Sequence, residues 1–219
     1  KTSANGVAVD GVTLKDGAVT STAASTITVA DNSDNLTLTS TDADSNSGPN
    51  LRLYRNNDSN ADGDVLGQID FEGRNDSSQD VVYARIRAVA EDITDGTEDA
   101  RLIIEKAVNG STTEIMRSVG SETVFNDGSI DLDFRVESNG NTHALFVDGG
   151  NNEVSIGASD ANSYYYKQLV VTAGDEGGIT IVDTSSGQSA LAFADGTSGN
   201  ERYRGRVLYD HATDTLSMG

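Results

Sequence analysis

The chain has 219 residues, a formal net charge of −20 and no cysteine. The absence of cysteine excludes disulfides and thiolate metal sites. The excess of acidic residues argues against binding to nucleic acid or to anionic membranes, because phosphate recognition needs clustered Lys and Arg. No apolar stretch has the length of a membrane-spanning helix, so we expect no membrane insertion.

Hydrophobic residues make up only 36% of the chain and aromatic residues 5%, which is little for a monomeric globule of this length. One explanation is disorder. The other is that further copies of the chain complete its core, and the regular, β-branched apolar pattern favours this second explanation. The chain begins with Lys rather than Met, so we expect a fragment or a processed form.

Short apolar runs with side chains two residues apart, such as Ile27-Thr28-Val29, are typical of β-strands. Asp-Gly and Asn-Gly pairs separate these runs and favour tight hairpin turns, because both residue types tolerate positive φ. The sequence therefore predicts an all-β fold with almost no helix. The expected strands cover 26–29, 35–40, 51–54, 67–72, three antiparallel strands within 81–118, and then 129–137, 144–147, 153–156, 164–172, 178–182, 190–194 and 204–209.

Four parts are expected along the chain. Residues 1–24 form a shaft-like β repeat and a linker, and residues 25–120 form a first β module. Residues 121–157 form a connecting β-hairpin shaft segment, and residues 158–219 form a second β module. The second module repeats a pattern of the first: LTL (36–38), LRL (51–53) and GQIDFE (67–72) correspond to ITI (179–181), LAF (191–193) and GRVLYD (205–210). Chance similarity between strands of one composition is the alternative.

Several of these segments have a joint order that points to one family. They are DNSDNLTL (31–38) followed by SGPNLRLYR (47–55), LGQIDFEG (66–73), ALFVDG (144–149) with NEVSIG (152–157), GVTLKDG (11–17) and RVLYDH (206–211). Together they resemble the tail-fibre and virion structural proteins of tailed bacteriophages, marine phages especially. Ser155 stands where the unit in 152–157 usually has Gly.

The resemblance implies an elongated, repeat-built fibre in which three identical chains intertwine about a three-fold axis. Triple β-helix or β-prism-like segments would alternate with short antiparallel hairpins. The implied partners are the other two copies, further virion proteins, and a glycan or protein on the host surface. The implied location is the virion, with a bacterial cell surface as the alternative. No receptor-binding residue can be carried over.

Catalytic motifs are not apparent in the sequence, so we expect no enzyme and no catalytic residues. The histidines, His143 and His211, are expected to be structural or exposed. Asp70 and Glu72 lie two apart on one expected strand and could flank a sugar bond, as glycosidases require. A capsular polysaccharide depolymerase is therefore one alternative, although exposed strand acids beside arginines explain the pair as well. A bacterial surface or matrix adhesin is another.

One loop has the spacing of a calcium site. Asp58, Asn60, Asp62 and Asp64 surround Gly63 as at the start of an EF-hand loop, but Ile69 occupies the position of the bidentate Glu. Calcium binding by these four residues is one hypothesis, and a plain turn rich in Asp and Asn is the other. Residues 42–46 are a weaker instance of the same pattern.

The aromatic residues cluster in one place, Tyr164-Tyr165-Tyr166. On a strand, alternate members would point to opposite sides. Packing in a core or between subunits is the favoured interpretation, and stacking on sugars is the alternative.

Overall fold

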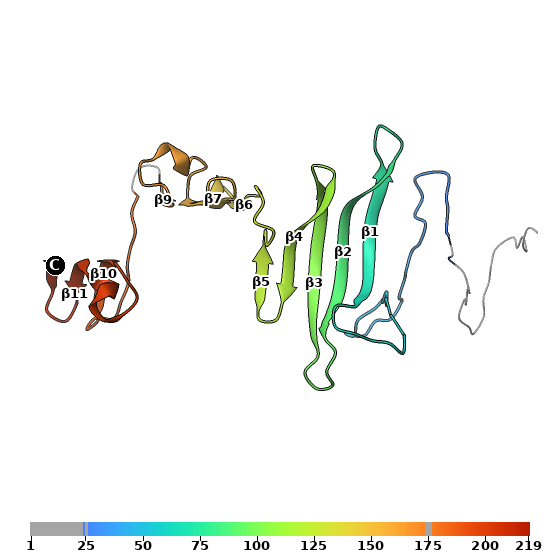
Figure 1. The fold of residues 1–219 in the computed structure, drawn as a ribbon, viewed down its shortest axis with the longest axis horizontal. Helices are drawn as coiled ribbons and strands as arrows, with labels where there is room; N and C mark the ends of the chain where they lie inside the picture. The colour runs from blue at the N-terminus through green and yellow to red at the C-terminus, as the bar shows by residue number, and fades with distance from the viewer. Residues whose placement is uncertain (1–23, 25, 174–176) are drawn as a thin grey trace, which may run out of the picture. The chain divides into compact units, whose positions relative to one another are not determined.

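The structure, a computed structural model, describes residues 24, 26–173 and 177–219. The β units expected at 1–23 lie outside this part of the chain. Two compact units are present, residues 1–52 and residues 53–219. The second unit holds three sheets with twelve strands in all and two short 3-10 helices (Figure 1). No α-helix occurs within the described ranges, so the all-β prediction is confirmed.

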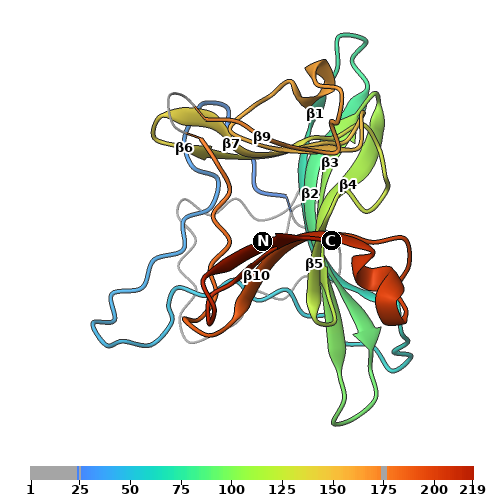
Figure 2. The same cartoon turned by 90° about the vertical axis from the view of Figure 1, so that its left-hand side faces the viewer.

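The first sheet is an antiparallel meander whose five strands follow one another in chain order, β1-β2-β3-β4-β5. Figure 2 shows these strands overlapping as a single layer. Asn109 and Gly110 both have positive φ between β3 and β4, which is the two-residue turn that matches the twist of a hairpin. The three strands predicted within 81–118 are β2, β3 and β4. The bounds are Val65–Arg74 for β1, Asp80–Asp92 for β2, Asp99–Val108 for β3, Ser111–Val119 for β4 and Glu122–Phe125 for β5.

The second sheet combines an antiparallel meander with one parallel strand. The meander is β6 (Phe134–Ser138), β7 (Asn141–Asp148) and β8 (Glu153–Ile156), and β9 (Leu169–Val171) runs parallel to β8. The connection between β8 and β9 contains the 3-10 helix η1 (Ala161–Ser163). It starts at Gly157, which has a φ of +86°. A Cβ added at this position would lie 2.2 Å from the Thr172 carbonyl oxygen, so only glycine fits here.

The third sheet is a smaller antiparallel meander. Its strands are β10 (Gln188–Phe193), β11 (Gly205–Asp210) and β12 (Thr215–Met218), and the 3-10 helix η2 (Gly199–Tyr203) lies in the connection from β10 to β11. The predicted strands at 190–194 and 204–209 correspond to β10 and β11. β12 was not predicted, because its run of alternating residues is short and ends the sequence.

Several predicted strands are wrong. Residues 26–29, 35–40, 51–54 and 178–182 form no strand, although they alternate as predicted. A strand exists only when another strand supplies its hydrogen bonds, and among the described residues these segments have no ladder partner. The expected strand at 129–137 begins only at Phe134, because the Asn126 amide group bonds the backbone of Ile130 and Leu132 and holds a turn there.

The two copies of the proposed repeat have one contact in common. Phe193 lies opposite Gly205 in the ladder of β10 and β11, and Leu53 packs against Gly67 of β1 at a distance that leaves no room for a Cβ. The sheets also continue past two expected module boundaries. β5 joins the first sheet beyond residue 120, and β9 joins the second sheet beyond residue 157.

Candidate functional site

The first sheet has one entirely apolar row that runs across all five strands. The ladder registers place its members side by side on one face of the sheet. They are Ile69, Ile86, Ile104, Met116 and Phe125. A second row on the same face contains Gly67, Ala88 and Leu102 on the first three strands and continues with the polar Ser118 and Thr123 on the last two.

This apolar face is open in the single chain. Ile69 is 43% exposed, Phe71 55% and Phe125 49%. In the described part of the chain only eight hydrophobic residues are buried, so large apolar side chains are mostly outside any core. Monomeric soluble proteins rarely expose contiguous apolar surface of this kind, and such surface marks a site of interaction.

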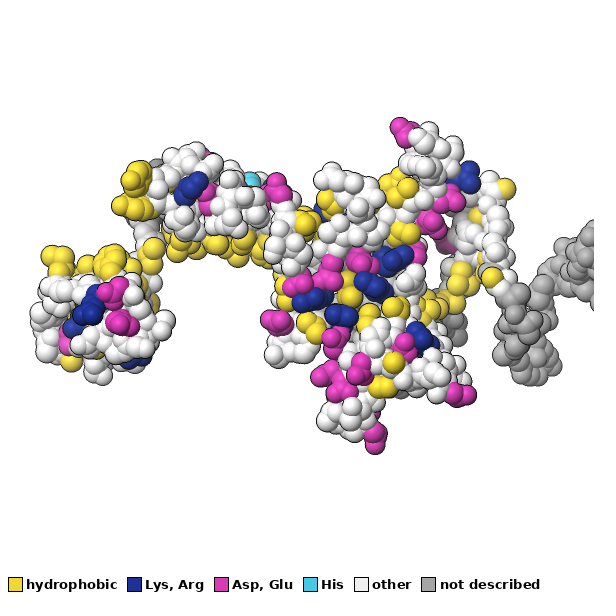
Figure 3. Space-filling model, in the orientation of Figure 1, with side chains coloured by type: hydrophobic (Ala, Val, Ile, Leu, Met, Phe, Trp, Pro, Cys, Tyr) yellow, Lys and Arg dark blue, Asp and Glu magenta, His cyan; other side chains and the backbone are white. Residues whose placement is uncertain are grey.

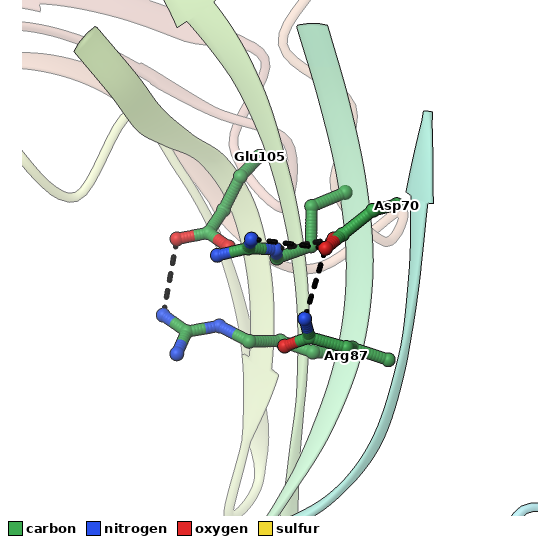
Figure 4. Close-up of polar contacts among 5 residues, drawn as sticks. Asp70, Arg87 and Glu105 are labelled. Carbon is green, nitrogen blue, oxygen red and sulfur yellow. Dashed lines mark hydrogen bonds and ion pairs between the residues drawn. The ribbon is translucent and has the colours of Figure 1, made fainter. Parts of the chain in front are cut away.

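The opposite face of the same sheet carries a network of ion pairs. Asp70 accepts two hydrogen bonds from Arg85, at 2.5 and 3.1 Å, and Arg87 bonds Glu105 at 3.0 Å (Figure 4). Arg117 continues the network on β4, where it pairs with Asp127 at 2.9 Å. Figure 3 shows basic and acidic side chains interspersed over this sheet.

The arginines cover the few buried apolar side chains of this face. Ile103 is 2% exposed and lies between Arg87 and Arg117 in the cross-strand row. Val89, also 2% exposed, faces Arg101. Arginine stems bury apolar surface while their charged ends remain paired. The charged face is therefore covered by side chains of its own chain, and the apolar face is not.

The second sheet has the same asymmetry. The cross-strand row Phe134, Val147, Val154, Leu169 is apolar throughout, and Leu169 at its end is 61% exposed. On the other face, Ser155 and Val170 are buried, because the connection between β8 and β9 returns the chain over them.

The third sheet repeats the pattern. Leu191, Val207 and Met218 form one apolar row, and Leu191 and Met218 in it are largely exposed. Leu208, on the opposite face, is buried. Each of the three sheets therefore has one finished face and one open apolar face. We take the three open faces together as the candidate functional site, a surface for assembly.

The three tyrosines were expected on a strand at 164–172, but they do not lie on one. They occupy a bend before β9, and Tyr165 and Tyr166 stack edge to face with their ring centroids 5.0 Å apart. Tyr165 is 92% exposed, which rules out packing in the core of its own chain. The remaining explanations for these exposed rings are contact with another subunit or contact with a ligand.

Asp70 and Glu72, the acids considered for glycoside hydrolysis, are separated by a register shift between Phe71 and Glu72. The hydrogen bond from Arg85 is the main reason that the pKa of the Asp70 carboxyl lies below its usual value. A glycosidase acid needs a raised pKa, so the environment of Asp70 suits an ion pair rather than proton donation.

Both histidines make local contacts. His143 packs edge-on against Phe146 and its Nδ1 lies 2.9 Å from the Thr142 hydroxyl. The Nε2 of His211 lies 3.2 Å from the Ser189 hydroxyl, a proximity that sequence reasoning missed. The pairing of β10 with β11 creates it, and the described residues show no carboxylate bonded to either ring, as a catalytic triad would require.

The four predicted calcium ligands do not converge. Asp64 forms an ion pair with Arg55 at 3.0 Å, and Asp62 accepts the backbone N–H of Ile93 at 3.1 Å. Among the described residues, no three His, Cys, Asp or Glu side chains come together in a way that could hold a metal. The calcium hypothesis for Asp58, Asn60, Asp62 and Asp64 stays a prediction.

No protein-family model and no curated protein sequence matches the chain. Within the described ranges, no helix has the length and apolar character needed to cross a bilayer. The candidate site must therefore be interpreted from its own geometry.

The ion-pair network predicts a clear effect of Arg87→Met. Methionine keeps apolar cover over Ile103 but leaves Glu105, whose side chain is 10% exposed, without its partner. We expect the free energy of unfolding in urea to fall by about 2 kcal/mol, less than for a fully buried pair because Arg87 is partly exposed. The control Arg74→Met breaks a largely exposed pair with Asp80 and should cost less than about 0.5 kcal/mol. Equal losses would contradict the role assigned to the network.

The lowered pKa of Asp70 predicts a pH dependence. Its stabilising effect is present above the unfolded-state pKa of about 3.9 and is lost as the pH falls through the lower folded-state pKa. Asp70→Asn should therefore lower the melting temperature at neutral pH, and the difference from the original chain should disappear in strong acid. Asp95→Asn, at a hairpin turn, is the control and should change neither. A difference for Asp70→Asn that is independent of pH would contradict the assignment.

The calcium hypothesis can be tested at Asp58, for which the structure shows no hydrogen bond or ion pair, so that Asp58→Asn disturbs no protein contact. If the site exists, millimolar CaCl2 raises the melting temperature above that in NaCl of matched ionic strength, because only the native state binds the ion. Asp58→Asn should reduce this increment and leave the NaCl value unchanged. No increment over matched NaCl would show that the hypothesis is wrong.

Proposed function

We propose that this chain is a non-enzymatic structural segment of a phage virion fibre, built as an intertwined homotrimer that spaces or presents a host-recognition surface. The observation that carries the proposal is the asymmetry of the three sheets. Each sheet has one face completed by its own chain and one apolar face left open.

Copies of the same chain are the best occupants of these open faces. The central row of each open face is apolar, so one row can pack against the same row of another copy. On the first sheet the charged side chain of this face, Lys106, lies in the neighbouring row with Phe71 and Ala84. A large apolar side chain that moves from water into such an interface contributes about 1.5–3 kcal/mol when it is fully buried. This packing also accounts for a hydrophobic content of only 36%, because several chains share one core.

The extended segments of the first unit support intertwining. Residues 26–29 and 35–40 alternate like strands but have no ladder partner in the part of the chain that the structure describes, and Ile27 and Leu36 are about three-fifths exposed. Neighbouring copies would supply both the hydrogen bonds and the apolar contacts that these segments lack. The number of copies, three, comes from the resemblance to phage fibres.

Presentation of a surface fits the exposed tyrosines. Tyr165 and Tyr166 project from a loop that is held by the second sheet, and aromatic rings in such positions stack on sugars or anchor protein contacts. A trimer would display the loop three times, so that weak single contacts gain avidity.

Two alternatives make different predictions. A capsular polysaccharide depolymerase would release reducing sugars from host capsule, whereas the proposed fibre segment would release none. An adhesin of a bacterial surface would share the architecture, and genes for capsid and tail proteins beside this gene would favour the virion.

Assembly through the apolar face predicts the effect of Ile86→Lys. We expect the original chain to sediment at equilibrium with the mass of a trimer. Lysine in the middle of the apolar row should shift the mass toward that of the monomer, because a buried unpaired ammonium is strongly unfavourable. Thr112→Lys adds the same charge at an exposed position on the opposite face and should leave the mass unchanged. A stable, compact monomer of the original chain would contradict the proposal.

A further inference from the structure

Three side chains that the proposed function does not use meet beside the β8–β9 connection. The parallel pairing of β8 with β9 continues backward through a hydrogen bond from the Val154 N–H to the Gln168 carbonyl, 2.9 Å long. It brings Lys167 next to Glu153. Helix η1 packs near β8 through the buried Ala161 and carries Asn162.

Among the described residues, Glu153 is the more deeply buried of the two buried carboxylates, the other being Glu105. Glu153 is only 2% exposed, and its Oε1 lies 3.1 Å from the Nζ of Lys167. The contact is an ion pair without the geometry of a hydrogen bond, and among the described residues this oxygen has no hydrogen-bond partner. A carboxylate buried without full hydrogen bonding is costly.

The Nζ of Lys167 has a second neighbour, the side-chain oxygen of Asn162, to which it donates a very short hydrogen bond. The amine is therefore held against a carboxamide on one side and a buried carboxylate on the other. The surroundings fix this arrangement, because the fully buried Ser155 hydroxyl bonds the Ala158 carbonyl at 2.6 Å and thereby anchors the start of the connection. Reactants held in contact this way gain greatly in rate.

We propose that Lys167 and Asn162 become joined by a side-chain amide bond, with Glu153 as the catalytic acid and base. Glu153 takes a proton from the Lys167 ammonium, and the neutral Nζ attacks the Asn162 Cγ. The Cγ–Nδ2 bond then breaks, and Glu153 returns its proton to the leaving nitrogen. Nζ gives up a second proton, which the leaving nitrogen also takes, so that an ammonium ion leaves, Glu153 is again a carboxylate, and one secondary amide remains. The neutral mass of the chain falls by that of one ammonia molecule. The reaction needs no oxidant, reductant or cofactor.

The bond would close a ring around residues 163–166, which include the two most exposed tyrosines, Tyr165 and Tyr166. A closed ring restricts the loop before any partner binds, and such preorganisation reduces the entropy lost on binding. The inference itself does not depend on the proposed fibre function, because the reaction takes place within one chain.

Two measurements on the purified chain test the bond. The intact mass should be lower than the sequence mass by one ammonia molecule. Trypsin acting on the denatured chain should fail to cut after Lys167, because an acylated lysine is not recognised. The digest should then contain residues 136–202 as one peptide, since Lys167 is the only Lys or Arg between Arg135 and Arg202.

Variants of the chain distinguish this amide bond from other reactions that release ammonia. Lys167→Arg and Asn162→Ala should each restore the full sequence mass, and Asn162→Ala should also restore cleavage after Lys167. Asn162→Asp should lose one water molecule instead of ammonia if the same bond forms. The control Lys106→Arg should still show the loss. A succinimide at Asn139-Gly140 would also release ammonia, but it would leave Lys167 cleavable.

Glu153→Gln keeps the size of the side chain and removes its ability to take the proton. The ammonia loss should therefore be abolished or slowed at least about tenfold, since general acid–base catalysis typically contributes about 10²–10⁴-fold. If this variant does not fold, the Lys167 and Asn162 variants still decide. Full sequence mass and complete cleavage after Lys167 in the original chain, also after prolonged incubation at mildly alkaline pH, would overturn the proposal.

Discussion

A β-sheet has two faces, and this chain finishes only one face of each of its three sheets. The open faces carry apolar rows, such as Ile69, Ile86 and Ile104 in the first sheet, that no other part of the described chain covers. Apolar surface of this extent in water opposes solubility and favours association. A fold built from single layers leaves this surface uncovered, and the proposed packing against further copies of the chain would bury it.

The first two sheets show two ways to cover a face without a second layer. On the first sheet, paired arginines such as Arg87 and Arg117 cover Ile103 and satisfy acids in their own row or the next. On the second, the connection from β8 to β9 folds back over Ser155 and Val170. On the third, Leu208, which lies opposite Ala190 in the ladder, is the buried residue of that face. The high acidity of the chain is thus partly structural, because acids such as Glu105 are needed to pair the covering arginines.

The sequence was sufficient to predict those strands whose partners lie next to them along the chain. The alternation within 81–118 and the Asn109-Gly110 turn predicted β2, β3 and β4, and the predicted strand 153–156 has the bounds of β8. The short runs within residues 26–54 alternate just as clearly but form no strand. Alternation indicates which side chains share a face, but it does not show whether a neighbouring strand is available to pair with. The hydrogen bonds between the Asn126 side chain and the Ile130 backbone hold a turn, so β6 begins later in the sequence than predicted.

The functional surface was predictable only in part. The low hydrophobic content pointed to a shared core, but the apolar rows depend on ladder registers, which short repeats of similar composition leave open. The group of Glu153, Lys167 and Asn162 depends on a parallel pair formed across a long connection, and no spacing in the sequence indicates it. The Asp70–Arg85 pair likewise depends on the register of β1 against β2. Sequence spacing alone placed Asp70 beside Glu72 instead.

The most direct test of assembly through the apolar face uses the absence of cysteine from the chain. A single cysteine is introduced by Ile104→Cys in the middle of the apolar row, and a second variant, Thr112→Cys, carries it on the opposite face. Both are oxidised at low protein concentration and compared on a denaturing, non-reducing gel. The account predicts disulfide-linked copies for Ile104→Cys and monomers for Thr112→Cys. Monomers for both variants, with equally fast reaction of both thiols toward a maleimide, would contradict it.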